Sequence, residues 1–169
     1  MTSKMLLSAF AAGAITSAGT AELVGVVGGQ TNVLLDFALI ESATGLEFGG
    51  LSAGVITPGN LGADSVAFAI TSPVSANLPT TFNYDSDDFF GSFAGSIEHR
   101  GSISFTGSAD VTLGNFTIAY DQGVGSFQVI TNLDFAGLSL FDVSITEVED
   151  PPADASSLQY TLVEIVEES

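Results

Sequence analysis

The segment Phe141-Asp-Val-Ser-Ile-Thr146 shows the pattern that decides the fold class. Apolar and polar residues alternate strictly through these six positions. This alternation indicates a strand with one buried face, because successive side chains of a strand point to opposite sides. The same period of two recurs in residues 31–40 and 64–70, where β-branched and aromatic residues lie between turn-forming residues. We therefore predict strands in all three segments.

Proline and glycine interrupt the rest of the chain too often for long helices. Pro58-Gly59, Ser72-Pro73 and Leu78-Pro79 are typical of turns. We predict an all-β fold of antiparallel strands in a sandwich or jelly-roll-like arrangement. Helix is expected only in an N-terminal signal helix and in one short turn at most. The residues expected in the core are Phe37, Phe68, Phe105, Phe116, Ile118 and Phe141.

The apolar positions change phase near the middle of the chain. Val111 and Leu113 occupy odd positions, whereas from Phe116 onward the apolar residues occupy even ones. A strand cannot change phase without an extra residue, because its side-chain period is two. We therefore predict a β-bulge or a tight turn at Gly114-Asn115.

The first 21 residues are typical of a secretory signal peptide. Lys4 is followed by an apolar run over residues 5–15 and by small residues at 17–21. The alternative is an N-terminal helix of the folded domain. With the signal peptide at 1–21, we expect a β-sandwich domain over 22–146, followed by an acidic linker and a C-terminal strand or tail over 147–169. The mature chain is expected to be secreted, extracellular or at the cell surface, without an integral membrane span.

The composition excludes several function classes. The 169 residues include 20 Asp and Glu but only 2 Lys and Arg, for a net charge of −18. Binding to nucleic acid is excluded, because phosphate contacts need many basic residues. The absence of cysteine excludes disulfides, zinc fingers and thiol nucleophiles. With 46% hydrophobic residues the chain has enough apolar material for a folded core.

Carboxylates are densest in Asp85-Ser-Asp-Asp88. Calcium prefers several oxygen ligands on one loop, so Asp85, Asp87 and Asp88 are the candidate metal ligands, with calcium as the possible cofactor. The segment is not an EF-hand, because Phe90 occupies the sixth position, which requires glycine. The alternative is a solvated turn, which aspartate and serine also favour.

Glu98-His99-Arg100 contains the only histidine of the chain. A histidine can act as a general base or a metal ligand. In a strand, however, His99 points away from the face shared by its two neighbours. We therefore favour a histidine whose hydrogen bonds are satisfied within the fold. No nucleophile or carboxylate pair is singled out by the sequence, and we expect no enzymatic activity.

Several short motifs resemble the body of the PEP-CTERM (exosortase-associated) proteins of bacteria. They lie in Gly91–Phe105, Val111–Ile118, Ile56–Gly62 and Leu140–Val143. The resemblance implies an exported, β-rich protein of the surface matrix or biofilm. The chain departs from that family at its C-terminus, because residues 162–169 lack the Pro-Glu-Pro sorting tag.

A second resemblance involves the Gly-x-Ile/Val-x-Phe-x-Gly strand of the haem-acquisition domain of actinobacterial surface proteins. It implies that His99 or Tyr120 would serve as the axial ligand of a haem.

The function expected from these observations is that of a secreted bacterial structural or matrix protein. Its expected partners are itself or other surface matrix components. Three segments with low charge and high β-propensity are candidates for strand pairing between copies: residues 31–40, 127–131 and 157–166. The alternative is that all three are ordinary internal strands of a monomer. The alternative function is an extracellular ligand-binding module for calcium, haem or a glycan.

Overall fold

The computed structural model describes residues 6–11, 23–85, 87–88, 91–143 and 158–163, the first and last of these ranges as backbone only. Of the predicted acidic linker and C-terminal strand or tail at 147–169, residues 147–157 and 164–169 lie outside the described residues, as do residues 144–146 of the segment discussed first. The elements are β1 (Leu6–Ala11), β2 (Leu23–Gly25), β3 (Gly29–Leu34), α1 (Phe37–Thr44), β4 (Leu46–Leu51), β5 (Val55–Ile56), β6 (Ser65–Ile70), β7 (Asn83–Asp85), β8 (Ser96–Arg100), β9 (Ser102–Gly107), β10 (Val111–Gly114), β11 (Thr117–Asp121), β12 (Ser126–Ile130), β13 (Ser139–Val143) and β14 (Leu158–Val163).

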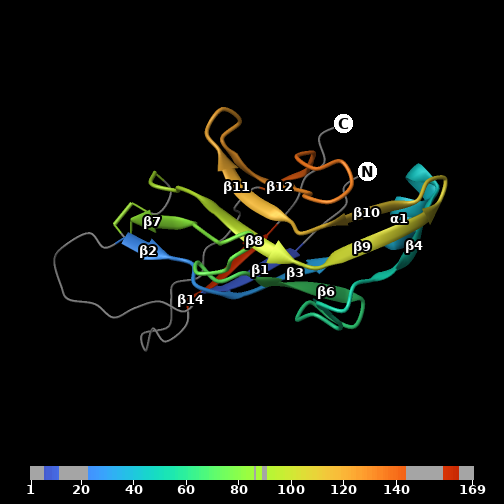
Figure 1. Ribbon diagram of the computed structural model, residues 1–169, viewed down its shortest axis with the longest axis horizontal. Helices are drawn as coiled ribbons and strands as arrows, with labels where there is room; N and C mark the ends of the chain where they lie inside the picture. The colour runs from blue at the N-terminus through green and yellow to red at the C-terminus, as the bar shows by residue number, and fades with distance from the viewer. Residues whose placement is uncertain (1–5, 12–22, 86, 89–90, 144–157, 164–169) are drawn as a thin grey trace.

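The predicted all-β, antiparallel fold is confirmed. The largest sheet has the strand order β13-β12-β11-β8-β6-β3-β1-β14, with β5 paired to the middle of β6 at Ala67 and Phe68. A three-stranded sheet has the order β10-β9-β4, and β2 pairs with β7. Figure 1 shows the large sheet curling, so that β11 and β12 lie opposite β3 and β6, while β4, β9, β10 and α1 lie together at one end.

The predicted phase change at Gly114-Asn115 marks a corner between two sheets rather than a bulge within one strand. β8 pairs with β11 in the large sheet, and β9 pairs with β10 in the small one. The two pairs form one long hairpin that bends where Gly101 meets Asn115, whose N–H donates to the Gly101 carbonyl at 2.8 Å. Gly101 has φ +115° and Asn115 has φ +47°. Both residues thus take left-handed conformations that allow the bend.

The core lies between the curled sheet and the small sheet. Of the residues predicted to be buried, Phe68, Phe105, Phe116 and Ile118 are buried. Phe37 and Phe141 are only half-buried and pack against the core from its margin. Phe37 lies at the start of α1, and Phe141 lies on the edge strand β13. At both positions one side of the ring therefore lacks a covering layer.

The strand predicted over residues 31–40 is wrong beyond Leu34, because residues 37–44 form α1. The side chain of Asp36 accepts a hydrogen bond from the N–H of Leu39 at 2.9 Å and caps the helix. At the other end Gly45 takes φ +72°, a left-handed conformation that ends the helix. The expectation of no more than one short helical turn was also wrong.

The N-terminal segment differs from expectation in the same way. Leu6–Ala11, predicted as part of a signal helix, form the strand β1. β1 pairs with β3 on one side and with β14 on the other. β14 lies within the segment for which the sequence predicted either a C-terminal strand or a tail, and it forms a strand. No helix among the described residues has the length and apolar character needed to cross a bilayer.

The pairing partners correct one further expectation. β12, which contains most of the candidate assembly segment 127–131, lies between β11 and β13. Both of its edges are therefore occupied within the chain, so this segment is not an open edge.

Candidate functional site

His99 lies at the centre of the structure and is 1% exposed. Its Nδ1 lies 2.9 Å from the carbonyl oxygen of Phe116, and its Nε2 lies 2.7 Å from Oγ1 of Thr31. A carbonyl oxygen can only accept, so Nδ1 carries the proton in the neutral ring. Nε2 then accepts a hydrogen bond from the Thr31 hydroxyl. The histidine is thus satisfied within the fold, as the favoured interpretation of the sequence predicted.

Burial also determines the charge of His99. Loss of water around the ring lowers its pKa from 6.5 to about 4, against the smaller opposing effect of the hydrogen bond to Phe116. The ring is therefore neutral near pH 7. Both of its nitrogens are engaged, which leaves neither nitrogen free as a metal ligand or a base.

Glu98 and Arg100 point away from His99 into different surroundings. Glu98 is buried and accepts hydrogen bonds from Ser96 Oγ at 2.7 Å and from Thr117 Oγ1 at 2.6 Å. Arg100 is exposed, and its Nη2 donates to Ser75 Oγ at 2.8 Å. The three consecutive residues therefore do not converge on one site.

The predicted calcium ligands Asp85, Asp87 and Asp88 lie in a turn at the end of β7. Oδ1 of Asp85 accepts from the N–H of Asp87 at 2.8 Å, and Oδ1 of Asp88 accepts from the N–H of Gly91 at 3.1 Å. These bonds are those of the turn interpretation. Within the described part of the chain, no three side chains of His, Cys, Asp or Glu come together in a way that can hold a metal ion. Calcium at these aspartates stays a prediction from sequence.

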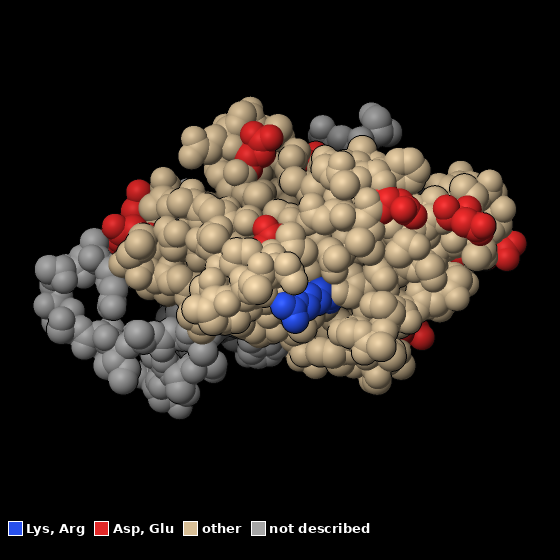
Figure 2. Space-filling model, viewed as in Figure 1, with Lys and Arg blue, Asp and Glu red and all other residues tan. Residues whose placement is uncertain are grey.

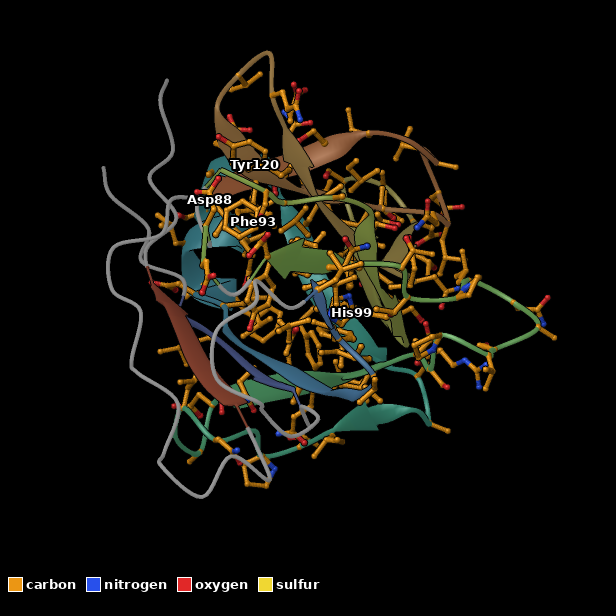
Figure 3. The ribbon with its side chains drawn as sticks, turned by 90° about the vertical axis from the view of Figure 1, so that its left-hand side faces the viewer. Asp88, Phe93, His99 and Tyr120 are labelled. Atoms are coloured by element: carbon orange, nitrogen blue, oxygen red, sulfur yellow. The ribbon has the colours of Figure 1, made fainter. Side chains whose placement is uncertain are left out.

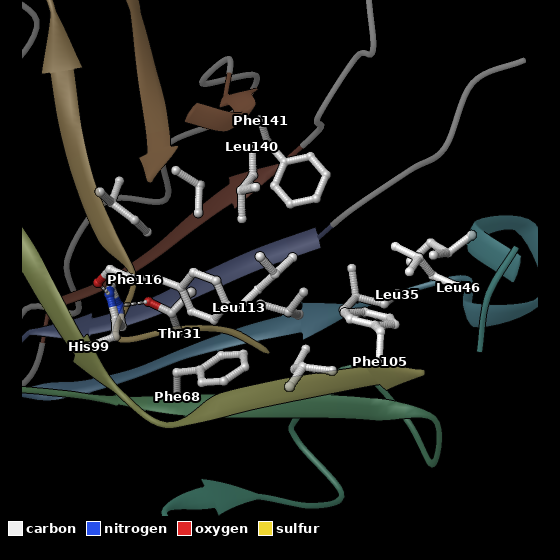
Figure 4. Close-up of a pocket in the computed structure, with 15 residues that line it drawn as sticks. Thr31, Leu35, Leu46, Phe68, His99, Phe105, Leu113, Phe116, Leu140 and Phe141 are labelled. Atoms are coloured by element: carbon white, nitrogen blue, oxygen red, sulfur yellow. Dashed lines mark hydrogen bonds between the residues drawn. The ribbon is translucent and has the colours of Figure 1, made fainter. Parts of the chain in front are cut away.

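A cavity of about 180 Å³ lies between the curled sheet and the small sheet (Figure 4). Its floor consists of buried side chains, and its rim consists of half-buried aliphatic and aromatic side chains. The lining residues are Thr31, Val33, Leu35, Ile40, Leu46, Phe68, His99, Ile103, Phe105, Leu113, Phe116, Ile118, Val129, Leu140 and Phe141.

The cavity is large for a chain of this size. Protein interiors pack densely, with few voids larger than a water molecule. Among the lining residues that the structure describes, only Thr31 and His99 have polar side chains, and they bond to each other (Figure 4). The lining therefore offers a bound molecule contact area rather than hydrogen bonds.

Tyr120, the other candidate axial ligand for a haem, belongs to a separate aromatic cluster. Its ring lies 5.1 Å from that of Phe127 and 5.5 Å from that of Phe93, measured between centroids. Figure 3 shows Tyr120 beside Phe93 and away from His99. Since the nitrogens of His99 are also engaged, these two side chains do not form a haem site together.

The surface reflects the acidic composition. Figure 2 shows acidic side chains dispersed over the visible face, together with one basic patch. Among the described residues Arg100 is the only Lys or Arg. The visible face thus offers isolated carboxylates rather than one concentrated anionic surface.

Searches against family models, curated proteins and solved structures found no match for this chain. The resemblances noted in the sequence therefore remain expectations.

Sequence reasoning missed the cavity. Its lining residues are spread from position 31 to position 141 and come from both main sheets and α1. Each looks like an ordinary core residue in its own segment. The space between the two sheets becomes apparent only when their relative positions in the fold are known.

Proposed function

We propose that the protein is an exported, non-enzymatic structural protein of the bacterial surface matrix, and that its copies assemble by strand addition. The resemblance to PEP-CTERM proteins and the predicted signal peptide support export. The strand content and the sheet edges of the fold support assembly. The engagement of His99 in structural hydrogen bonds supports a role without catalysis.

The position of β1 is the observation that carries the proposal. β1 lies inside the predicted signal peptide and separates β3 from β14. It pairs with β14 over six positions, from Leu6 with Val163 to Ala11 with Leu158. Removal of residues 1–21 would expose an edge of β3 and an edge of β14 at once. Exposed strand edges pair readily with other strands.

Strand direction favours pairing between copies over pairing within one chain. β3 and β14 both run antiparallel to β1 and therefore run parallel to each other. If β14 moved sideways onto β3, the new pair would be parallel, which is slightly less stable per residue. The β14 strand of a second copy can approach in the opposite direction and form an antiparallel pair.

The charges of the two strands and the length of the segment between β13 and β14 both allow β14 to pair with β3 of a second copy. Neither β3 nor β14 contains a charged residue. Strand pairing there avoids direct repulsion between two acidic chains. Residues 144–157 connect β13 to β14, and an extended segment of about 14 residues spans up to roughly 46–50 Å.

The experiment compares residues 1–169 with residues 22–169 by size-exclusion chromatography with light scattering. We expect 1–169 to be monomeric and 22–169 to form oligomers. Deletion of 151–169 from the shorter chain should restore a folded monomer. Thr161→Pro removes a backbone donor within β14 and should weaken assembly, whereas Thr161→Ala keeps that donor and should not.

Two outcomes would overturn the assembly proposal. One is a folded 22–169 chain that remains monomeric at high concentration. The other is an oligomer whose size is unchanged by the deletion of 151–169. Export is tested separately, by the mass of the protein recovered outside bacterial cells, which should correspond to cleavage near residue 21. A product that retains residues 1–21, or that stays inside the cells, contradicts export.

A further inference from the structure

We propose that the cavity between the two sheets is a binding site for a small, neutral, apolar molecule of about the size of benzene or toluene. The inference does not rest on strand assembly, because the lining residues that the structure describes all lie between positions 31 and 141.

The chemistry of the lining defines the class of ligand. Thirteen of the fifteen lining residues are aliphatic or aromatic, and none of the fifteen is acidic or basic apart from the buried His99. A charged ligand would lose its hydration without gaining a partner. A ligand with hydroxyl groups would find no free donor here, because the hydroxyl hydrogen of Thr31 and both His99 nitrogens are already bonded. An apolar molecule has neither disadvantage.

The size of the cavity sets the size of the ligand. An engineered cavity of about 150 Å³ lined by Leu, Ile and Phe side chains stays dry and binds benzene. The present cavity is slightly larger, at about 180 Å³. Phe68 and Phe116 meet edge to face at its floor, with ring centroids 4.9 Å apart, and can present ring surfaces to an aromatic guest.

The rim provides a route of entry. Leu35 lies just before α1 and Ile40 lies on α1, whereas Leu140 and Phe141 come from the edge strand β13. All four side chains are half-buried. A small molecule thus needs only side-chain movements at this rim to reach the floor, rather than separation of the sheets.

The test uses His99 as an internal reporter. It is the only histidine of the chain and lies in the cavity lining, so its Cε1–H resonance is unambiguous. Titration with benzene should shift this resonance in a saturable manner, with a dissociation constant of about 1 mM or tighter. Phenol, which adds one hydroxyl group, should bind at least several-fold more weakly.

A matched pair of variants localises the binding. Leu113→Phe adds volume inside the cavity, whereas Leu51→Phe makes the same change at a half-buried core position outside the lining. We expect the first variant to lose benzene binding and the second to retain it. If Leu113→Phe fails to fold, Phe141→Ala at the rim supplies the test, because an enlarged cavity should admit naphthalene as well as benzene.

Clear results would refute the proposal. An unchanged His99 resonance up to the aqueous solubility limit of benzene excludes binding at this site. Equal benzene affinity in the folded Leu113→Phe variant places the binding elsewhere. Phenol that binds more tightly than benzene contradicts the apolar class of ligand, as does Phe141→Ala without naphthalene binding.

Discussion

Acidification should destabilise the protein through one residue, His99, well before the ring is protonated in the folded state. The ring is 1% exposed and holds the Phe116 carbonyl with Nδ1 and the Thr31 hydroxyl with Nε2. Desolvation lowers its pKa to about 4, although the bond to Phe116 acts in the opposite direction. An unfolded chain has no such environment, and its histidine titrates near the ordinary value of 6.5.

The sign follows from which state binds the extra proton. Between pH 6.5 and pH 4 the unfolded chain is increasingly protonated at this residue while the folded chain is not. The free energy of unfolding therefore rises with pH through this window and falls on acidification. His99 alone should remove roughly 2 kcal/mol between pH 7 and pH 5, and roughly 3 kcal/mol by pH 4.

Two measurements test this prediction. The chemical shift of His99 Cε1–H in the folded protein should stay at its neutral value down to about pH 5. Urea unfolding of the natural protein and of His99→Gln, followed from pH 7 to pH 5, should differ in slope by the histidine contribution. The carboxylates titrate in both proteins, so their effect cancels in this difference.

A His99 resonance that titrates near pH 6.5 in the folded protein would refute the reasoning. It would mean that water reaches the ring, and hence that the ring is not sealed between Thr31 and Phe116. The same pH slope in the natural protein and in the folded variant would refute it independently.

Three further predictions concern stability and are measured by chemical denaturation. Phe68→Ala, at a side chain 3% exposed, should lower the free energy of unfolding by about 3–5 kcal/mol; a loss below about 1 kcal/mol would mean that the ring is not packed as described. Glu98→Ala leaves two hydroxyl donors without their acceptor and should lower it by about 1–3 kcal/mol, whereas Glu98→Gln should cost less; equal losses would contradict this. At Gly101 φ is +115°, and an added Cβ would lie 2.8 Å from the Val55 side chain; at Gly125 φ is +80° and nothing lies within 4 Å of such an atom. Gly101→Ala should therefore lower the free energy of unfolding more than Gly125→Ala. The reverse order would show that the corner at Gly101 tolerates a side chain.

The strand pattern could be predicted because it depends on local periodicity. Residues 64–70 alternate Val66, Phe68 and Ile70 with small residues, and the structure places β6 over Ser65–Ile70. The change of phase at Gly114-Asn115 was located correctly for the same reason. Its meaning was not, since a bulge and a corner between sheets shift the phase alike, and only the pairing of β8 with β11 and of β9 with β10 distinguishes them.

Two of the wrong predictions, the strand beyond Leu34 and the helix at Leu6–Ala11, have a common cause, which is that short apolar segments fit more than one element. Over residues 31–40 a period of two fits Val33, Leu35, Phe37 and Leu39, yet Asp36 caps a helix that begins at Phe37. The signal of that cap, an aspartate before an apolar run with Gly45 eight residues after the first helical position, was present in the sequence. Leu6–Ala11 show the same ambiguity, because an apolar run without polar residues at fixed positions has no period that separates helix from strand.

For the triplet Glu98-His99-Arg100, the period of the strand predicts which side chains share a face, but it does not predict their burial or their hydrogen-bond partners. Alternation alone separates His99 from its neighbours, and the structure agrees. Alternation does not show that both side chains are buried, and a buried histidine and a buried glutamate must each find partners. Those partners, Thr31 for the histidine and Thr117 for the glutamate, lie 68 and 19 residues away in the chain. The strand is thus determined by its own sequence, whereas the chemistry of each of its faces is determined by strands that the fold brings alongside it.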